Sequence, residues 1–204
     1  MSNFKKRFLI SLLAFPIIYI FLFQNILSNI LICLVFILCA YEWHKIFKKK
    51  NFFYFFGFII LLFFLISLIK IYNLEDYNLK FLWLILIAWL TDIGGYIFGK
   101  IFGGPKLIKI SPNKTWSGAF GSLFLSQFAF IIYYLDPHFK LNTNIFIFQL
   151  FLSIAGQIGD ILMSYVKRTY NIKDTSNFIP GHGGFLDRVD GLIWVFIFGY
   201  FLTI

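Results

Sequence analysis

The chain of 204 residues is 60% hydrophobic and only 13% charged, and it carries 30 phenylalanines. This composition excludes an ordinary soluble domain, which has to cover its surface with polar side chains. The chain therefore belongs in a lipid bilayer, and the placement of its charges must explain the net charge of +9.

Seven apolar runs are candidate helices, at about 8–23, 26–41, 52–71, 81–99, 116–135, 145–166 and 192–204. The longer runs approach the roughly 20 residues that cross about 30 Å of hydrocarbon. The first run follows a basic segment, as in a signal peptide, but no small-residue cleavage site comes after it, so we expect a retained span. The last run is short enough to be tilted or only partly inserted. The sequence predicts an all-α, polytopic integral membrane helical bundle with six or seven transmembrane helices, forming a single membrane domain over residues 1–204.

Basic residues gather in alternate connections between these runs. These connections hold Lys45, Lys48, Lys49, Lys50, Lys100, Lys106, Lys109, Lys114, Lys167, Arg168, Lys173 and Arg188. The remaining connections are nearly neutral, with Glu75, Asp76, Lys80, Asp136 and Lys140. This positive-inside pattern predicts a cytoplasmic N-terminus and cytoplasmic loops at 100–115 and 167–190. It accounts for the net charge without nucleic acid, and it places both polar loops where a nucleotide would be available.

Two acidic residues lie inside apolar runs, where an ionisable side chain is costly and is by default a functional candidate. For Asp92, a structural hydrogen bond to a neighbouring helix is the alternative to a substrate role. Asp160 begins a helical stripe with Ser164, Lys167 and Arg168. Hard oxygen ligands beside phosphate-binding cations suit Mg²⁺ carried by a nucleotide. The alternative is an aspartate held by hydrogen bonds within the bundle, with Lys167 and Arg168 as ordinary positive-inside residues.

Small residues at a spacing of four indicate close helix contacts. Gly95 and Gly99 form one such pair, and Ala155 and Gly159 form another. Because small side chains let two backbones approach, we predict a packing role for all four.

The stretch from Ser164 to Asp190 has a density of polar residues unlike the rest of the chain. Its Pro-Gly-His-Gly-Gly turn at 180–184 would stop a helix and let backbone N–H groups approach a phosphate. Asp187 and Asp190 follow at once as candidate cation ligands. Taken by type alone, such a turn is a solvated loop and His182 is a turn residue. The combination favours a functional site.

This stretch resembles the C-terminal signature of the phosphatidate cytidylyltransferase (CDP-diacylglycerol synthase) family. The signature runs Ser, Lys-Arg, Lys-Asp, Pro-Gly-His-Gly-Gly, Asp-Arg and Asp, and every element is present in order and at matching spacing over 164–190. Segments 92–103 and 111–118 are similar to two further family segments, so the resemblance spans about 89–191. The chain departs from the family at Asn113, where Lys is more common, and at Ser117, where Glu is more common.

The resemblance implies a nucleotidyltransferase of phospholipid biosynthesis that joins CTP and phosphatidate into CDP-diacylglycerol and releases pyrophosphate. It implies N-terminal helices in 1–80 and catalytic helices in 81–204. The catalytic residues that it implies are Asp160, Asp187, Lys167, Arg168 and His182. The substrate-binding residues that it implies are Ser111, Lys114, Ser164, Lys173, Gly183, Gly184, Arg188, Asp190 and Asp92. Asp160 and Asp187, with Ser164 close by, would hold Mg²⁺, and a second cation is compatible with this arrangement. His182 could orient a phosphate or contact Asp187.

Other classes of protein stay open from the sequence. The nearest are a CTP-dependent lipid kinase and a cytidylyltransferase for another lipid phosphate. A small ion-coupled transporter that uses Asp92 and Asp160 is another, although it leaves the polar turn unexplained, and a structural scaffold is a third. We expect a location in the cell inner (plasma) membrane with the active site facing the cytoplasm and surrounded by membrane lipid. We expect no nucleic acid partner, and the small-residue faces permit a homodimer.

Overall fold

The computed structural model describes residues 25–47, 51–74, 77–132, 145–178 and 183–203. The helices in this part are α2 (Asn25–Ile46), α3 (Phe52–Tyr72), α4 (Tyr77–Phe102), α5 (Trp116–Ser126), the 3-10 helix η1 (Gln127–Phe130), α7 (Ile145–Thr169) and α8 (Leu186–Thr203). The described residues contain no strand, so the predicted all-α class is confirmed. The predicted first span at 8–23 lies outside the described residues.

Four of the helices are long and apolar enough to cross a membrane: Ile26–Ile46, Phe52–Tyr72, Asn78–Phe102 and Ile145–Thr169. They correspond to four of the predicted runs. Their outer faces are apolar, and Phe52 of α3 is 76% exposed. Side chains of this kind favour contact with lipid and not with water. The chain is therefore a multi-pass membrane protein, while the total number of spans and the side of the N-terminus stay predictions.

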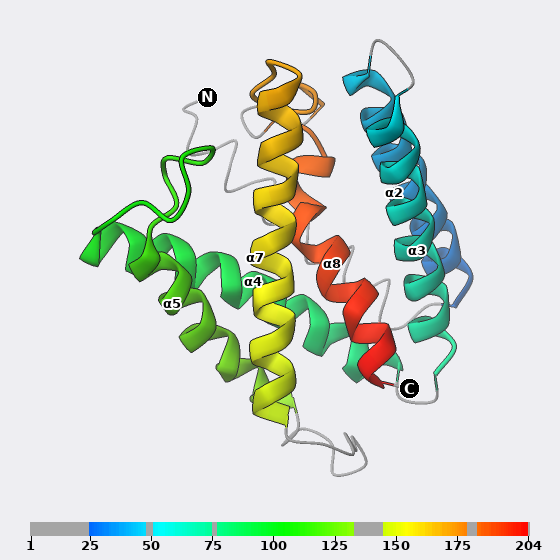
Figure 1. Cartoon of the computed structure of the whole chain (residues 1–204). Helices are drawn as coiled ribbons and strands as arrows, with labels where there is room; N and C mark the ends of the chain where they lie inside the picture. The colour runs from blue at the N-terminus through cyan, green and yellow to red at the C-terminus, as the bar shows by residue number, and fades with distance from the viewer. Residues whose placement is uncertain (1–24, 48–50, 75–76, 133–144, 179–182, 204) are drawn as a thin grey trace, which may run out of the picture.

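The helices are arranged around the antiparallel pair α7 and α8. Figure 1 shows α7 and α8 side by side, the hairpin of α2 and α3 beside α8, and α4 running across the pair. Apolar side chains from all these helices form the core, with Trp83, Leu152 and Phe196 almost completely buried. The C-terminal ends of α2 and α7 and the start of α8 meet at one end of the bundle.

Glycines allow helices α4 and α5 to pack closely. A methyl group at Gly94 would overlap the backbone of Gly121, and one at Gly95 would lie 2.9 Å from the Ser122 hydroxyl. Gly99 faces Thr115 in the same contact. The predicted packing role of Gly95 and Gly99 is confirmed, and it is played within one chain. The face of Gly95 and Gly99 is occupied by α5, so it no longer supports the predicted homodimer.

The second predicted pair lies between α7 and α8. Ala155 is buried, and a methyl group at Gly159 would overlap the ring of Trp194. This close contact brings the two helices near enough for their polar residues to meet.

Helix α8 begins at Leu186, earlier than the predicted start at Leu192, and α7 continues to Thr169. The expected loop at 167–190 is thus shorter, and Asp187 and Asp190 lie on helical turns. The charges suggested a loop, but an acidic residue in the first turn of a helix is favourable because the N-terminal N–H groups carry partial positive charge. Asp187 occupies that turn.

Candidate active site

The connection between α4 and α5 folds into a compact loop that presents Lys114. Gly103 and Gly104 adopt φ values of 58° and 97°, a conformation that glycine adopts without strain. Lys106 pairs with Thr115 in an isolated β-bridge, and the Leu107 N–H donates to the Lys114 carbonyl at 2.8 Å. The loop therefore returns to α5 with Lys114 facing α7.

Asp160 of α7 is the point where three elements meet. Lys114 Nζ lies 3.3 Å from Asp160 Oδ2, and the two side chains are 29% and 26% exposed. Asp190 of α8 lies close enough to Asp160 for their two carboxyl groups to interact. A methyl group at Gly191 would lie 2.6 Å from Asp160 Oδ1, so glycine leaves room for the carboxyl group. Loop, α7 and α8 thus converge on one acidic side chain.

A cavity of about 280 Å³ opens beside Asp160. Its polar lining includes Asp92, Ser111, Lys114 and Gln157. Asp92 makes no hydrogen bond to another described residue, so the alternative of a structural hydrogen bond is not supported in this part of the chain. A structural hydrogen bond between α4 and α7 is made instead by the neighbouring Thr91, whose hydroxyl donates to Ser153 at 2.8 Å. Asp92 also lines a small neighbouring cavity with Arg188.

Asp187 lies at the start of α8 with both carboxylate oxygens engaged. Lys167 Nζ lies 2.7 Å from Oδ1, and the Asp187 and Lys167 side chains are only 4% and 13% exposed. Oδ2 accepts from the Thr175 N–H at 2.8 Å, the Gly184 N–H at 3.0 Å and the Thr175 hydroxyl at 3.0 Å. Burial would raise the pKa of Asp187, but the hydrogen bonds from Lys167, Thr175 and Gly184 outweigh it and hold the pKa below its usual value.

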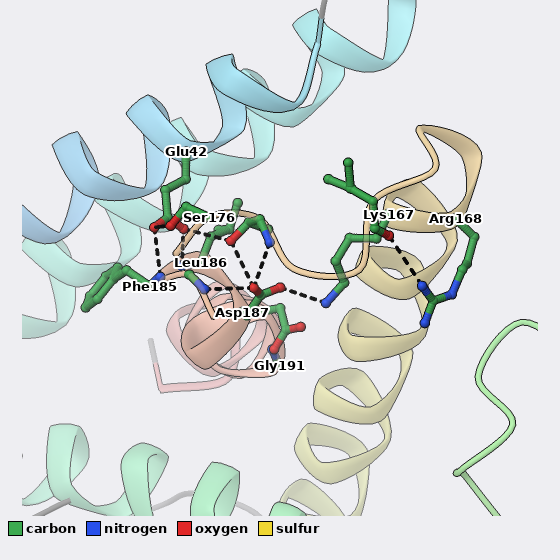
Figure 2. A network of polar contacts seen from close by, with 12 residues as sticks. Glu42, Lys167, Arg168, Ser176, Phe185, Leu186, Asp187 and Gly191 are labelled. Carbon is green, nitrogen blue, oxygen red and sulfur yellow. Dashed lines mark hydrogen bonds and ion pairs between the residues drawn. The ribbon is translucent and has the colours of Figure 1, made fainter. Parts of the chain in front are cut away.

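Glu42, which no sequence pattern singled out, has a central place in this network (Figure 2). Glu42 is 2% exposed, and its carboxylate accepts from the backbone N–H groups of Phe185 and Leu186 at 2.9 and 2.8 Å. It also accepts from the hydroxyls of Thr175 at 2.8 Å and Ser176 at 2.6 Å. The predicted span ended at Tyr41, one residue before Glu42, whereas α2 continues to Ile46. The sequence does contain a signal for Glu42, because it is an acidic residue directly after an apolar run.

The other predicted site residues lie around these two groups. Arg168 is exposed and donates to the Ile172 carbonyl at 3.3 Å, Lys173 is exposed, and Ser164 is half-buried on α7. Gly183 has a φ of 83°, and its missing side chain leaves room for Asp174 and Asp187. The Gly184 N–H, expected to approach a phosphate, donates to Asp187. Predicted His182 lies outside the described residues.

Of the two positions that depart from the family pattern, Asn113 lies in the loop between α4 and α5, and Ser117 lies in the first turn of α5. Asn113 lines the cavity beside Asp160. The Ser117 hydroxyl donates to the Gly103 carbonyl and lies 3.0 Å from the Thr115 hydroxyl. Ser117 therefore stabilises the loop.

The acidic groups fit a cation that arrives with a phosphate ligand. Asp160 and Asp190 bring two carboxyl groups close together, and a cation bound beside them would offset the repulsion between their charges. Among the described residues, no three Asp, Glu, His or Cys side chains converge to hold a metal ion by themselves. Mg²⁺ commonly takes one or two carboxylates and completes its shell with water and substrate phosphates.

These features define a multi-pass membrane protein with a site of mixed acidic and basic residues at one end of its bundle, suited to a phosphate-bearing ligand. The model of the Cytidylyltransferase family matches residues 48–204, and the chain belongs to this family. The resemblance recognised in the sequence is therefore confirmed.

Three relatives that the chain matches carry the same name. It is 40% identical over 137 residues to the phosphatidate cytidylyltransferase of Bacillus subtilis strain 168, covering 66% of this chain and 51% of the relative. It is 44% identical over 120 residues to that of Staphylococcus aureus strain COL, covering 56% and 45%. It is 43% identical over 111 residues to that of Brucella suis biovar 1, covering 54% and 41%. The chain spans about half the length of the curated relatives it matches.

Proposed function

We propose that this chain catalyses phosphatidate cytidylyl transfer. An oxygen of the phosphatidate phosphate attacks the α-phosphorus of CTP in line. The new oxygen to phosphorus bond gives CDP-diacylglycerol, and the bond from the α-phosphorus to the bridging oxygen breaks to release pyrophosphate. The observation that carries the proposal is the convergence of Lys114, Asp160 and Asp190 beside a cavity, within the family's signature segments.

Charge develops on phosphate oxygens in this reaction, so the protein contributes mainly by positioning and by electrostatic stabilisation. Lys114 is anchored beside Asp160 and borders the cavity, where its ammonium group can bind a phosphate oxygen. Lys167 has three N–H donors, and Asp187 takes one of them. The other two donors can hold a phosphate close to Asp187. No covalent enzyme intermediate is needed.

We propose Mg²⁺ as the cofactor, held by Asp160 and Asp187, with Ser164 nearby. When bound, Mg²⁺ would supply neutralisation of the phosphate charge, and a second cation would add to it. The contact of Asp160 with Asp190 supports this assignment, because Asp190 lies one turn after Asp187 on α8. Among the described residues no hydrogen bond joins Asp160 to Asp187 directly. A cation and its phosphate ligands would have to bridge them.

We also propose that the site faces the cytoplasm and that the chain lies in the cell inner membrane. The support is the clustering of basic residues in alternate connections, which orients membrane proteins. Lys114 and Lys167 belong to this cytoplasmic set and contact the site.

The test is a mass-spectrometric assay of the full chain, purified in detergent, with CTP, Mg²⁺ and a panel of lipid phosphates. CDP-diacylglycerol is the expected product, and CTP labelled at the α-phosphate should pass its label to the lipid. Label from the γ-phosphate would identify a lipid kinase and overturn the proposal. Transfer to another lipid phosphate in preference to phosphatidate would correct the substrate. Ion flux in proteoliposomes without CTP, and no lipid product, would identify a transporter.

The carboxylates are tested by Asp160→Asn and Asp187→Asn, which keep the side-chain shape and remove the charge. We expect both variants to lose transfer while their helix content stays near that of the wild type. Asp136→Asn, in a connection predicted on the opposite face, is the matched control and should retain activity. Full activity in both site variants would refute the metal assignment.

A further inference from the structure

Glu42 is the buried acid that the proposed reaction does not use. It lies on α2, more than 130 positions before its partners in the chain, and its four hydrogen bonds to described residues go to Thr175, Ser176, Phe185 and Leu186. Each of its two oxygens accepts one backbone N–H and one hydroxyl. A buried acid is costly unless such donors compensate it, so this arrangement fixes the four partner residues closely against Glu42.

The position of Glu42 is itself fixed by its neighbours. The Trp43 indole N–H donates to the Tyr54 carbonyl at 3.0 Å, which ties the end of α2 to the start of α3. A methyl group at Gly57 would overlap the Trp43 ring, so the two helices are in close contact there. Glu42 is therefore presented from a rigid hairpin and not from a mobile loop.

Two features connect Glu42 to Asp187. The first is helix α8 itself, because the Phe185 and Leu186 N–H groups that bind Glu42 immediately precede Asp187. The second is the Thr175 hydroxyl, which lies 2.8 Å from Glu42 Oε2 and 3.0 Å from Asp187 Oδ2. Figure 2 shows Glu42 and Asp187 on either side of Leu186 at the start of α8.

A hydroxyl has one hydrogen and can donate to only one carboxylate at a time. When the Thr175 hydroxyl donates to Glu42, it leaves Asp187 Oδ2 with the two backbone donors, from Thr175 and Gly184. Among the described residues, no other group then occupies that acceptor position on Asp187, so it can take another ligand. Gly184 makes this arrangement possible, since a methyl group there would overlap the Thr175 hydroxyl and lie 2.5 Å from Glu42 Oε2.

We propose that Glu42, acting through the Thr175 hydroxyl and the start of α8, is a positioning residue that sets the orientation of Asp187 in the site. Its catalytic consequence rests on the proposed function. Its structural consequence, the ordering of the Asp187 carboxylate, does not. The two are therefore tested separately.

Thr175 and Ser176 provide a matched pair of variants. Each donates one hydroxyl hydrogen bond to Glu42, but of the two hydroxyls only that of Thr175 also contacts Asp187. Thr175→Val removes the hydroxyl and keeps the shape, Thr175→Ser keeps the hydroxyl, and Ser176→Ala removes the control hydroxyl. Glu42→Gln keeps the size of the side chain, but its NH₂ group must face one of the two backbone N–H donors.

The first readout is amide hydrogen exchange of the full chain in detergent, without metal or nucleotide. The Gly184 N–H reports the Asp187 orientation because it donates to Oδ2. We expect its exchange to accelerate in Thr175→Val and Glu42→Gln and to stay at the wild-type rate in Thr175→Ser and Ser176→Ala. Equal exchange in Thr175→Val and Ser176→Ala would overturn the proposal, whether or not the chain is an active transferase.

The second readout is the Mg²⁺ concentration that half-saturates cytidylyl transfer. Loss of a partner that orients a metal ligand typically costs about 10- to 100-fold, and we expect a rise of that size in Thr175→Val. Thr175→Ser should restore the wild-type value. A purely structural role would lower the maximal rate through loss of folded protein and leave the half-saturating concentration unchanged, which would overturn the positioning role. Absence of transfer in the wild type would refute the proposed function and leave the exchange experiment to decide on Glu42.

Discussion

The ion pair between Lys167 and Asp187 allows stability and activity to be separated. The pair has an Nζ to Oδ1 distance of 2.7 Å, and the two side chains are 13% and 4% exposed. Lys167→Met keeps the length of the side chain and removes the charge, which leaves the Asp187 carboxylate buried without its cation. Breaking a buried pair in this way costs about 3 to 5 kcal/mol. Because Asp187 retains its donors from Thr175 and Gly184, we expect a loss of free energy of unfolding near the lower limit, about 3 kcal/mol.

The double variant Lys167→Met with Asp187→Asn removes both charges. We expect it to recover about 1 to 2 kcal/mol of the loss, because no unpaired charge stays buried. Transfer activity should be absent from both variants, since each lacks a group proposed to contact phosphate or metal. The measurement is reversible unfolding in mixed detergent micelles, followed by circular dichroism, alongside the lipid product assay. The reasoning is wrong if Lys167→Met costs less than about 1 kcal/mol, or if the double variant is no more stable than the single one.

Further predictions concern packing and pH. Gly94→Ala should lower the free energy of unfolding by about 1 to 3 kcal/mol through overpacking against the Gly121 backbone. Gly95→Ala should cost less because its new methyl group meets only the Ser122 hydroxyl, and equal losses in the two variants would contradict this account. The folded pKa of Asp187 is lowered, so its stabilisation is present above the unfolded pKa of about 3.9 and is lost as the pH falls through the lower folded value. The difference in Tm between wild type and Asp187→Asn should therefore be constant from pH 7 to about 5 and shrink below about 4, and a difference that grows on acidification would show that the sign is wrong.

Several features of the fold were legible in the sequence because they depend on local composition. Apolar runs predicted α2, α3, α4 and α7, since only helices satisfy their backbone groups within a single segment in lipid. Glycine spacing predicted the close contact of α4 with another helix, because glycines let two backbones approach whichever helix is the partner. The polar signature near the C-terminus predicted the family for the same reason, since its residues are close together along the chain.

The residue at which α8 begins could not be predicted from local composition. The charges of Asp187 and Asp190 predicted a loop, but the donors that hold Asp187 come from Lys167 and from a turn that precedes the helix. An acidic residue stabilises the first turn of a helix, but the sequence alone does not show where that helix begins. The boundary therefore depended on tertiary contacts.

What the sequence determined by itself is a membrane bundle with its polar chemistry gathered in alternate connections, because hydrophobicity and charge are properties of each residue. Only the tertiary structure decided which acids meet. It brought Asp160 close to Asp190 and placed Glu42 of α2 against the start of α8. These residues are far apart in sequence, and the directions in which helices pack set their distances. No spacing along the chain encodes those directions.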